Sequence, residues 1–351
     1  MSNPNGFFDC YNIIFDFSLL GDNESESLFL FHNEVVKDYI EKCFKIISSQ
    51  PTDELIDLFI KQTYDINFLL YWLNRIFTFL DRVYMKEKHR GSLAENEMEF
   101  YKELYFNPIK DDIYKELGKL IKQDRNGNKE TRNKIKSIMK ILNALDIMEP
   151  QIAKEKEKGK NEVVWIPDKL NSNPNKYFTY IYQDEWFEKY FKEETIQFAK
   201  EKVEKEIIAN SAIEFILSQL KYLEEEKERQ NEYINEKFHD SLNKINYHCL
   251  FESVEKLVKM DNGIDFMLEN RKKDELKKVY ELLKLYEPSL NVLKEAFVSF
   301  MKKKCEELKE KKVAKDGEEF NNFKNEIENL VIESFENDAL FQDEKNKILS
   351  N

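Results

Sequence analysis

Cysteine and histidine are the residue types that could supply a nucleophile or a metal ligand, and this sequence has few of them. The four cysteines, Cys10, Cys43, Cys249 and Cys305, are widely separated and form no Cys-x-x-Cys pair. His248 adjoins Cys249, but adjacent residues on a helix point about 100° apart, and no second pair of ligands lies nearby. We therefore expect reduced thiols on helix faces, with neither a metal site nor a catalytic dyad.

Other common catalytic and ligand-binding motifs are missing from the sequence. It has no phosphate-binding loop, no dinucleotide-binding glycine pattern, no His-Glu-x-x-His motif and no nucleophile elbow. The segment DRNGN, residues 124–128, resembles part of a calcium loop but lacks the spaced acids and the terminal Glu. With 68 acidic residues, pairs of carboxylates are expected by chance. We expect no catalytic residues, no metal and no cofactor.

The segment FFDCYNIIFDFSLL, residues 7–20, is unusually apolar for a surface helix. At 100° per residue, its first apolar arc consists of Cys10, Ile13, Ile14, Phe17 and Leu20. Its second apolar arc consists of Phe7, Phe8, Tyr11, Phe15 and Leu19. A narrow polar stripe consists of Asp9, Asn12 and Asp16. Because a surface helix normally has one apolar stripe, this helix is expected either to lie deep inside a bundle or to bind something on its far side.

The composition predicts an all-α fold. The 351 residues include only eight glycines and seven prolines, while 35% are charged and 41% hydrophobic, a mixture typical of long helices with solvated faces. The net charge of −13 argues against a nucleic-acid ligand. No apolar run is long enough to span a membrane, and the first six residues, MSNPNG, do not resemble a signal peptide. We expect an intracellular protein, cytoplasmic or nuclear, with no membrane partner.

Helical periodicity is nearly continuous, and short polar turns interrupt it. Before residue 150 we expect helices over 7–20, 28–47, from 52 onward, 66–87, 96–125 with a bend at Pro108, and 129–145. Residues 151–176 carry charge without periodicity and read as a connector. Helices are then expected over 177–209, 211–234, 239–260, 264–285 and 291–312, followed by another pair. About five helices on either side of the connector indicate a repeated five-helix unit. Several large aromatics are expected in the bundle cores, namely Trp72, Phe77, Phe79 and Trp186.

Several stretches resemble the N-terminal region of cullins, the scaffold subunits of multisubunit ubiquitin ligases. In LEEEKERQNEYI, residues 223–234, the cullin pattern Leu-x-x-Glu-x-x-Arg-x-x-x-Tyr-Leu is matched by Leu223, Glu226, Arg229 and Tyr233. DELKKVYELL (274–283) and ESFENDALF (333–341) resemble the family's Asp-Leu-x-x-Met-Tyr-x-Leu helix and the Ser-Phe-x-Asn-Asp-x-x-Phe of its third repeat. LNRIFTFLDRVYMKE (73–87) and LIKQDRNGN (120–128) are similar to the middle helices of the first repeat.

The resemblance implies stacked five-helix bundles, the cullin repeats, that form an elongated, curved helical stalk. Residues 7–150 would form repeat 1, residues 151–176 a connector, residues 177–290 repeat 2 and residues 291–351 part of repeat 3. The implied function is a noncatalytic scaffold that binds a substrate adaptor of BTB-like fold, with an F-box or similar receptor, at its first repeat. The family's helix before the aromatic one has no room here, and the C-terminal half that binds a RING subunit is missing. We therefore expect a fragment or a truncated form.

The resemblance also assigns adaptor-binding residues. Tyr11 and Phe15 align with the family's aromatic pair in the second helix of repeat 1, and Phe8 lies on the same side. Leu142 is the expected contribution of the fifth helix, with Ile141 as the alternative. The first arc would then face the core and the second arc the adaptor. In the competing interpretation, the aromatics of the second arc simply pack inside the repeat.

Two other functions stay open at this point. A helical tethering subunit of a vesicle-trafficking complex would have similar stacked bundles and a similar acidic composition. A ubiquitin-transferring enzyme would need an activated cysteine, and the cysteines here lack the neighbours that activate a thiol. Co-purification with adaptors, and not with membrane complexes, would distinguish the scaffold from the tether.

Overall fold

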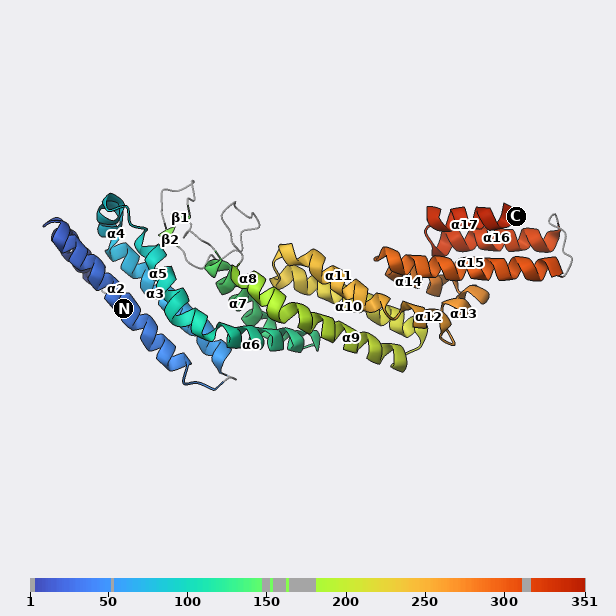
Figure 1. Cartoon of the computed structure of the whole chain (residues 1–351), viewed down its shortest axis with the longest axis horizontal. Helices are drawn as coiled ribbons and strands as arrows, with labels where there is room; N and C mark the ends of the chain where they lie inside the picture. Colours follow the sequence, from blue (N-terminus) through green and yellow to red (C-terminus); the bar gives the residue numbers. More distant parts are fainter. Residues whose placement is uncertain are drawn as a thin grey trace. The chain divides into compact units, whose positions relative to one another are not determined.

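The protein is built almost entirely of helices. The computed structural model describes residues 4–51, 54–146, 152–153, 162–163, 181–310 and 317–350 (Figure 1). The chain divides into two compact units, Met1–Phe191 and Lys192–Asn351. The prediction of an all-α fold is confirmed, and the only strands among the described residues are two residues long. These are β1 (Ile152–Ala153) and β2 (Glu162–Val163), which pair antiparallel.

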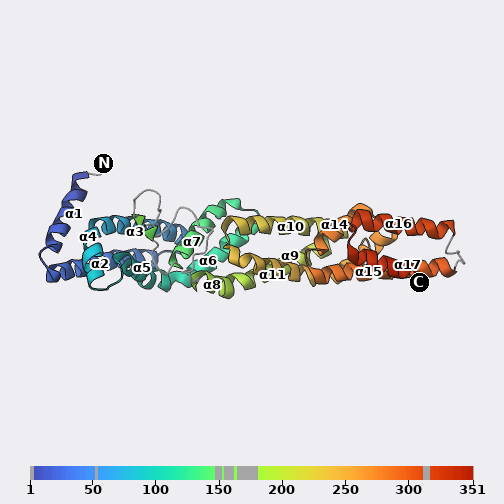
Figure 2. The same ribbon diagram turned by 90° about the horizontal axis from the view of Figure 1, so that it is seen from above.

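The first unit contains five nearly continuous helical runs before residue 146, as the periodicity predicts. Its helices are α1 (Pro4–Ser18), α2 (Asp22–Ile47), α3 (Leu55–Ile76), α4 (Thr78–Leu80), η1 (Asp81–Met85), α5 (Leu93–Tyr101), η2 (Lys102–Phe106), α6 (Asn107–Arg125), η3 (Lys129–Thr131), α7 (Arg132–Leu145), α8 (Ile181–Trp186) and η4 (Phe187–Phe191). Here η1, η2 and η4 are π-helical and η3 is a 3₁₀ turn. In Figure 2, α1 crosses one end of this unit at a steep angle to α2.

Local sequence signals explain several of these boundaries. Ser92 and Glu95 form a capping box at the start of α5, in which each side chain accepts the backbone N–H of the other residue. Asp81 supports the same turn, because its carboxylate accepts the Leu93 N–H at 2.8 Å. The bend predicted at Pro108 lies one turn earlier, in the π-helical η2. Pro108 itself sits in the first turn of α6, where its missing N–H is tolerated.

The core of the first unit has two parts. In the middle, fully buried aromatic side chains stack and tilt against one another, namely Phe59, Tyr105, Phe106 and Tyr114. Near α1 a separate cluster, the end cluster, consists of the buried residues Leu28, Phe77, Leu80, Tyr84, Met85 and Leu93. Ile14 of α1 packs against it. The end cluster therefore links α1 to α2, α3 and α5.

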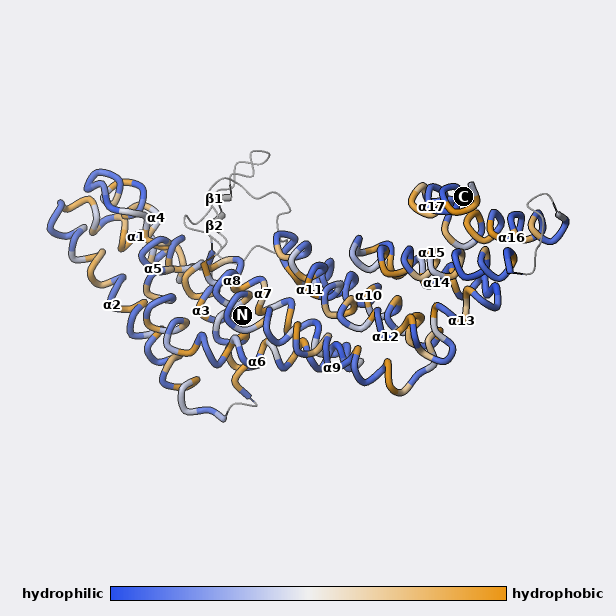
Figure 3. Tube along the Cα trace, turned by 45° about the vertical axis from the view of Figure 1, so that its right-hand side comes forward, coloured by the Kyte–Doolittle hydropathy of each residue, from blue (hydrophilic) through white to orange (hydrophobic). Residues whose placement is uncertain are grey.

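The second unit is a bundle of longer and shorter helices. They are α9 (Lys192–Ala209), α10 (Ala212–Tyr233), η5 (Glu236–Phe238), α11 (His239–Phe251), α12 (Val254–Lys259), α13 (Ile264–Glu269), α14 (Lys273–Leu283), α15 (Glu287–Glu310), α16 (Glu318–Ser334) and α17 (Ala339–Ser350). Phe297, Phe335 and Phe341 pack together in its core. Hydrophobic and hydrophilic residues alternate along these helices, as Figure 3 shows, so each helix has one side to bury.

Two predicted helices of the second unit are each broken in two. The predicted helix 239–260 ends at Phe251 and restarts at Val254. The predicted helix 264–285 is interrupted between Glu269 and Lys273, where Arg271 has a φ of 56°. A residue in this left-handed region cannot continue a right-handed helix. Periodicity continues across both breaks, which is why the sequence predicted single helices.

Other predictions have mixed outcomes. Phe77 and Trp186 are buried as predicted, and Trp186 stacks on Phe191 with ring centroids 4.6 Å apart. Trp72 is not in a core, because 39% of its surface is exposed, and Phe79 is half-buried. The predicted connector, 151–176, lies outside the described residues except for β1 and β2. The repeat boundaries at 150, 176 and 290 stay predictions.

Candidate functional site

Helix α1 rests on the first unit through the second arc. The Phe15 ring meets the Phe79 ring of α4 edge-on, with centroids 4.7 Å apart and planes at 72°. Phe7 meets Trp72 of α3 in the same way at 5.8 Å. Tyr11 lies between these contacts and stacks on Phe15 with centroids 6.2 Å apart. Residues 7, 11 and 15 recur every four positions, which places them on one side of the helix.

Most of the first arc faces solvent, contrary to the prediction, while Phe8 and Leu19 of the second arc are exposed as well. Ile13 is 65% exposed and Leu20 is 69% exposed, while Cys10 and Phe17 are also exposed. Only Ile14 of this arc turns inward, toward the end cluster. The expectation that the first arc enters the core and the second arc stays free is therefore wrong. The packing partners of α1, Trp72 and Phe79, lie far from it in the sequence. The pattern of residues 7–20 alone therefore does not indicate which arc they cover.

Phe8 is the predicted site residue that is clearly accessible. It is 60% exposed and touches Phe7 edge-on at 5.5 Å. Two aromatics of α3, Phe68 and Trp72, are 65% and 39% exposed and contact each other at 6.3 Å. Because Phe7 bridges to Trp72, these side chains extend the apolar surface from α1 onto α3. Phe68 was not among the predicted site residues. Asp57, Lys61 and Asp65 precede it at helical spacing and are exposed, so this polar stripe of α3 could have indicated the exposed face.

We call the exposed apolar side chains of this region the α1 surface. It consists of Phe8, Ile13 and Phe17 of α1, Leu19 and Leu20 of the turn that follows α1, and Phe68 and Trp72 of α3. The acidic residues Asp9 and Asp16 are exposed between its two edges. Single exposed apolar residues are common on proteins, but this many large apolar side chains exposed along one helix and its neighbour, here on either side of an acidic stripe, are typical of an interaction site.

Leu142 does not belong to the α1 surface. It is fully buried in α7, and so is Ile141. Helix α7 packs against α3, α6 and α8, whereas α1 packs against α2, α3 and α4. The structure therefore does not bring Leu142 together with Phe8, Tyr11 and Phe15. Its place in the repeat interior follows from the regular apolar stripe of α7, which has one buried side.

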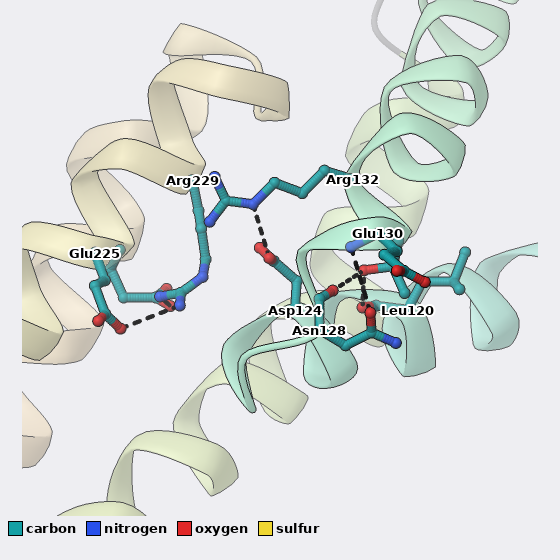
Figure 4. A network of polar contacts seen from close by, with 9 residues as sticks. Leu120, Asp124, Asn128, Glu130, Arg132, Glu225 and Arg229 are labelled. Carbon is teal, nitrogen blue, oxygen red and sulfur yellow. Dashed lines mark hydrogen bonds and ion pairs between the residues drawn. The ribbon is translucent and has the colours of Figure 1, made fainter.

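The motifs that resemble cullins form buried ion pairs (Figure 4). In the second unit, Arg229 Nη1 lies 2.9 Å from Glu226 Oε1, and both side chains are nearly inaccessible. Arg229 Nη2 also reaches Glu225 at 3.3 Å. In the first unit, Arg132 Nε lies 2.7 Å from Asp124 Oδ1, whose side chain is fully buried. The Asp124–Arg132 pair joins α6 to α7, whereas the pairs of Arg229 with Glu225 and Glu226 lie within α10.

Three of the four cysteines lie in surroundings that suppress their reactivity. Burial raises the pKa of the Cys43, Cys249 and Cys305 thiols, so the nucleophilic thiolate is disfavoured. The neighbouring His248 turns toward Glu252 at the surface, 3.6 Å away. In the part of the chain that the structure describes, no three His, Cys, Asp or Glu side chains gather as a metal site would require. No helix in these described ranges combines the length and apolar character of a membrane span.

Comparison with known proteins supports the resemblance seen in the motifs. A search of curated proteins returned no match. The family model of the cullin alpha solenoid domain, however, matches residues 3–351. This match covers both units and nearly every residue of the chain. Together with the helical architecture, it shows that the chain belongs to the cullin family.

Proposed function

We propose that this chain is the noncatalytic scaffold of a cullin-RING ubiquitin ligase and that its α1 surface binds a substrate adaptor of BTB-like fold. Cullins are scaffolds rather than enzymes, and the family generally binds adaptors and RING proteins. Membership of the family supports the scaffold over the vesicle-tethering alternative. The cytoplasm or the nucleus would be the place of such a ligase.

The observation that carries the adaptor proposal is the exposure of large apolar side chains on a helix that is otherwise well anchored. Phe8, Ile13 and Leu20 each expose more than half of their surface. Covering such side chains with a partner is favourable, by roughly 25 cal/mol for each Å² of apolar area removed from water. The edge-on contacts of Phe7 and Phe15 already hold the helix in place. Binding of the adaptor would therefore lose little conformational entropy through the ordering of α1.

The four residues assigned by resemblance would then have different roles. Phe8 would contact the adaptor directly. Tyr11 and Phe15, which are half-buried, would hold α1 on the unit and add only their exposed edges. Leu142 is inaccessible and would contribute through the packing of α7. A recognition helix presenting apolar anchors to a groove of the partner fits this arrangement.

Calorimetric titration with F-box-type and other BTB-fold adaptors tests the proposal. We expect binding by the wild-type chain and at least a tenfold loss, about 1.4 kcal/mol, in an Ile13→Ala, Phe17→Ala double variant with unchanged helix content. Ile46→Ala is the matched control, because Ile46 is equally apolar and half-exposed but lies at the other end of α2. Failure of every BTB-fold adaptor to bind the folded chain would contradict the proposal.

A further inference from the structure

A buried polar contact joins three helices beneath the end cluster. Nε2 of His32, in α2, lies 3.0 Å from Oε1 of Glu97, in α5, and neither side chain is accessible to solvent. Nδ2 of Asn74, in α3, donates a hydrogen bond to the other Glu97 oxygen at 2.7 Å. A titratable pair in such a position is costly unless its members satisfy each other. It has no contact with the α1 surface, so adaptor binding does not explain it.

The pair connects to α1 through a short series of packed rings and side chains. The His32 ring lies edge-on against Phe77, with centroids 4.9 Å apart and planes at 67°. Phe77 belongs to the end cluster, against which Ile14 of α1 packs. Two residues after Phe77, Phe79 receives the edge of Phe15. A displacement of His32 would therefore reach both inward contacts that hold the C-terminal half of α1.

Other charged groups face the pair as well. The carboxylate of Asp81, in η1, acts on Glu97 and interacts with His32. Arg82 of η1 and Glu95 of α5 act in turn on Asp81. Burial raises the pKa of Glu97, although the proximity of His32 and the hydrogen bond from Asn74 oppose the change. The close His32 Nε2 and Glu97 Oε1 atoms lack the geometry of a good hydrogen bond. Burial also raises the pKa of Asp81. A second carboxylate nearby makes it harder for Glu97 to remain ionised.

The direction of the pH effect follows from this environment. Because the folded protein holds the Glu97 proton more tightly than the unfolded chain does, folding stability falls as the pH rises above the ordinary range of a carboxyl group. When Glu97 loses this proton, an ionised carboxylate is left in the interior, out of reach of solvent. The tie between α2 and α5 is then weakened.

We propose that the buried contact of Glu97 with His32 and Asn74 is a positioning element for α1, which is held firmly while Glu97 is uncharged and is loosened when a charge develops on this buried carboxyl at higher pH. The pair touches no adaptor and acts only through Phe77 and the end cluster. The consequence for adaptor affinity rests on the proposed function, whereas the effect on α1 itself does not.

Amide hydrogen exchange of residues 4–18 in the free full-length chain tests this positioning role. After correction for intrinsic exchange, we expect the protection factors of wild-type α1 to fall about tenfold or more between about pH 5.5 and 8.5. In Glu97→Gln the protection should stay flat, because the amide cannot release a proton. Glu99→Gln is the matched control, since Glu99 is exposed on the same helix and its variant should keep the wild-type profile.

A second variant covers the case in which Glu97→Gln does not fold. Asn74→Leu removes a donor to the Glu97 carboxylate, so the pH at which protection falls should move upward. A wild-type profile that is flat with pH, or one that is the same in Glu97→Gln, would overturn the proposal, as would an unmoved midpoint in Asn74→Leu. Adaptor titrations at the lower and the higher pH then show whether loosening of α1 changes the affinity for the adaptor. If no adaptor binds while α1 protection still follows the pair, the proposed function fails and the positioning role stands.

Discussion

The ring of Phe15 in α1 meets the ring of Phe79 in α4 edge-on at 4.7 Å. This geometry, in which the positive edge of one ring faces the negative face of the other, is favourable beyond the area that it buries. With the contact between Phe7 and Trp72, it determines which side of α1 is covered. The side left free carries Ile13, one of the largest exposed apolar groups of the first unit.

Phe15→Ala should loosen α1 more than Phe17→Ala does. The Phe15 variant loses the contact with Phe79 and leaves a gap beside it, which we expect to cost about 2 kcal/mol. Phe17 is 40% exposed, so its variant should cost less than about 1 kcal/mol. Urea denaturation, together with amide exchange of residues 4–18, measures both. Equal losses in the two variants would contradict the observed orientation of α1.

Asp146→Ala should destabilise the first unit through the start of α8. The Asp146 carboxylate is almost fully buried and accepts the N–H groups of Tyr182 at 2.7 Å and Gln183 at 3.2 Å. Removal leaves these donors without their acceptor, at an expected cost of about 2 kcal/mol. Asp146→Asn keeps one acceptor oxygen and should lose less. The denaturation midpoint measures both variants. Asp112→Asn, at an exposed pair with Lys115, should leave that midpoint unchanged.

Much of the fold was predictable because its determinants are local. Apolar periodicity and polar turns located the five helical runs before residue 146. The breaks within 239–260 and 264–285 were missed because periodicity persists across them. At Arg271 the left-handed φ occurs in a residue type that does not favour it, while the asparagine of this turn, Asn270, lies one position earlier as the C-cap of α13. Tertiary packing over-determines this conformation, and packing cannot be read from a single stretch of sequence.

The sequence predicts that the candidate site lies on a helix, but it does not predict which side of that helix faces solvent. Both arcs of residues 7–20 are large and apolar, so hydrophobicity alone does not rank them. Ser18, which interrupts the second arc, does not prevent packing, because its hydroxyl donates to the Ile14 carbonyl at 2.7 Å. The inward arc was chosen by Trp72 and Phe79, whose positions depend on the packing of α3 and α4. The interpretation in which the second arc packs inside the repeat agrees with the contacts of Phe7 and Phe15, but not with Phe8, which is 60% exposed.

Glu226→Gln should destabilise the second unit, although the two side chains have nearly the same size. Arg229 is buried against Glu226, and neutralising the carboxylate leaves an incompletely paired cation, with an expected loss of about 2–3 kcal/mol. The double variant Glu226→Leu, Arg229→Met should lose less than the sum of the single variants, since both charges are then removed. A double-mutant cycle measures the coupling. Lys303→Gln, at an exposed pair with Glu269, serves as the control, and additive losses at Glu226 and Arg229 would argue against a buried pair.

Glu185 should make the first unit sensitive to acid. Burial would raise its pKa, but hydrogen bonds from Lys110 at 2.8 Å and Lys189 at 2.7 Å outweigh burial and hold the pKa of this carboxyl below its ordinary value of 4.5. A carboxyl group with a lowered pKa in the folded state contributes stability above its unfolded pKa, and the contribution disappears as the pH falls through the folded value.

The urea denaturation midpoints of the wild type and of Glu185→Gln, compared at about pH 7, 5 and 3, test this effect. At pH 7 and 5 the wild type should be more stable than the variant, because only the wild type has the charge that Lys110 and Lys189 stabilise. The difference should shrink toward zero at pH 3, where the wild-type carboxyl takes up its proton. Glu103→Gln, at an exposed position on the neighbouring π-helical turn, should instead track the wild type throughout. A wild-type advantage at Glu185 that stays constant down to pH 3 would mean that packing, and not charge, holds α8 against α6.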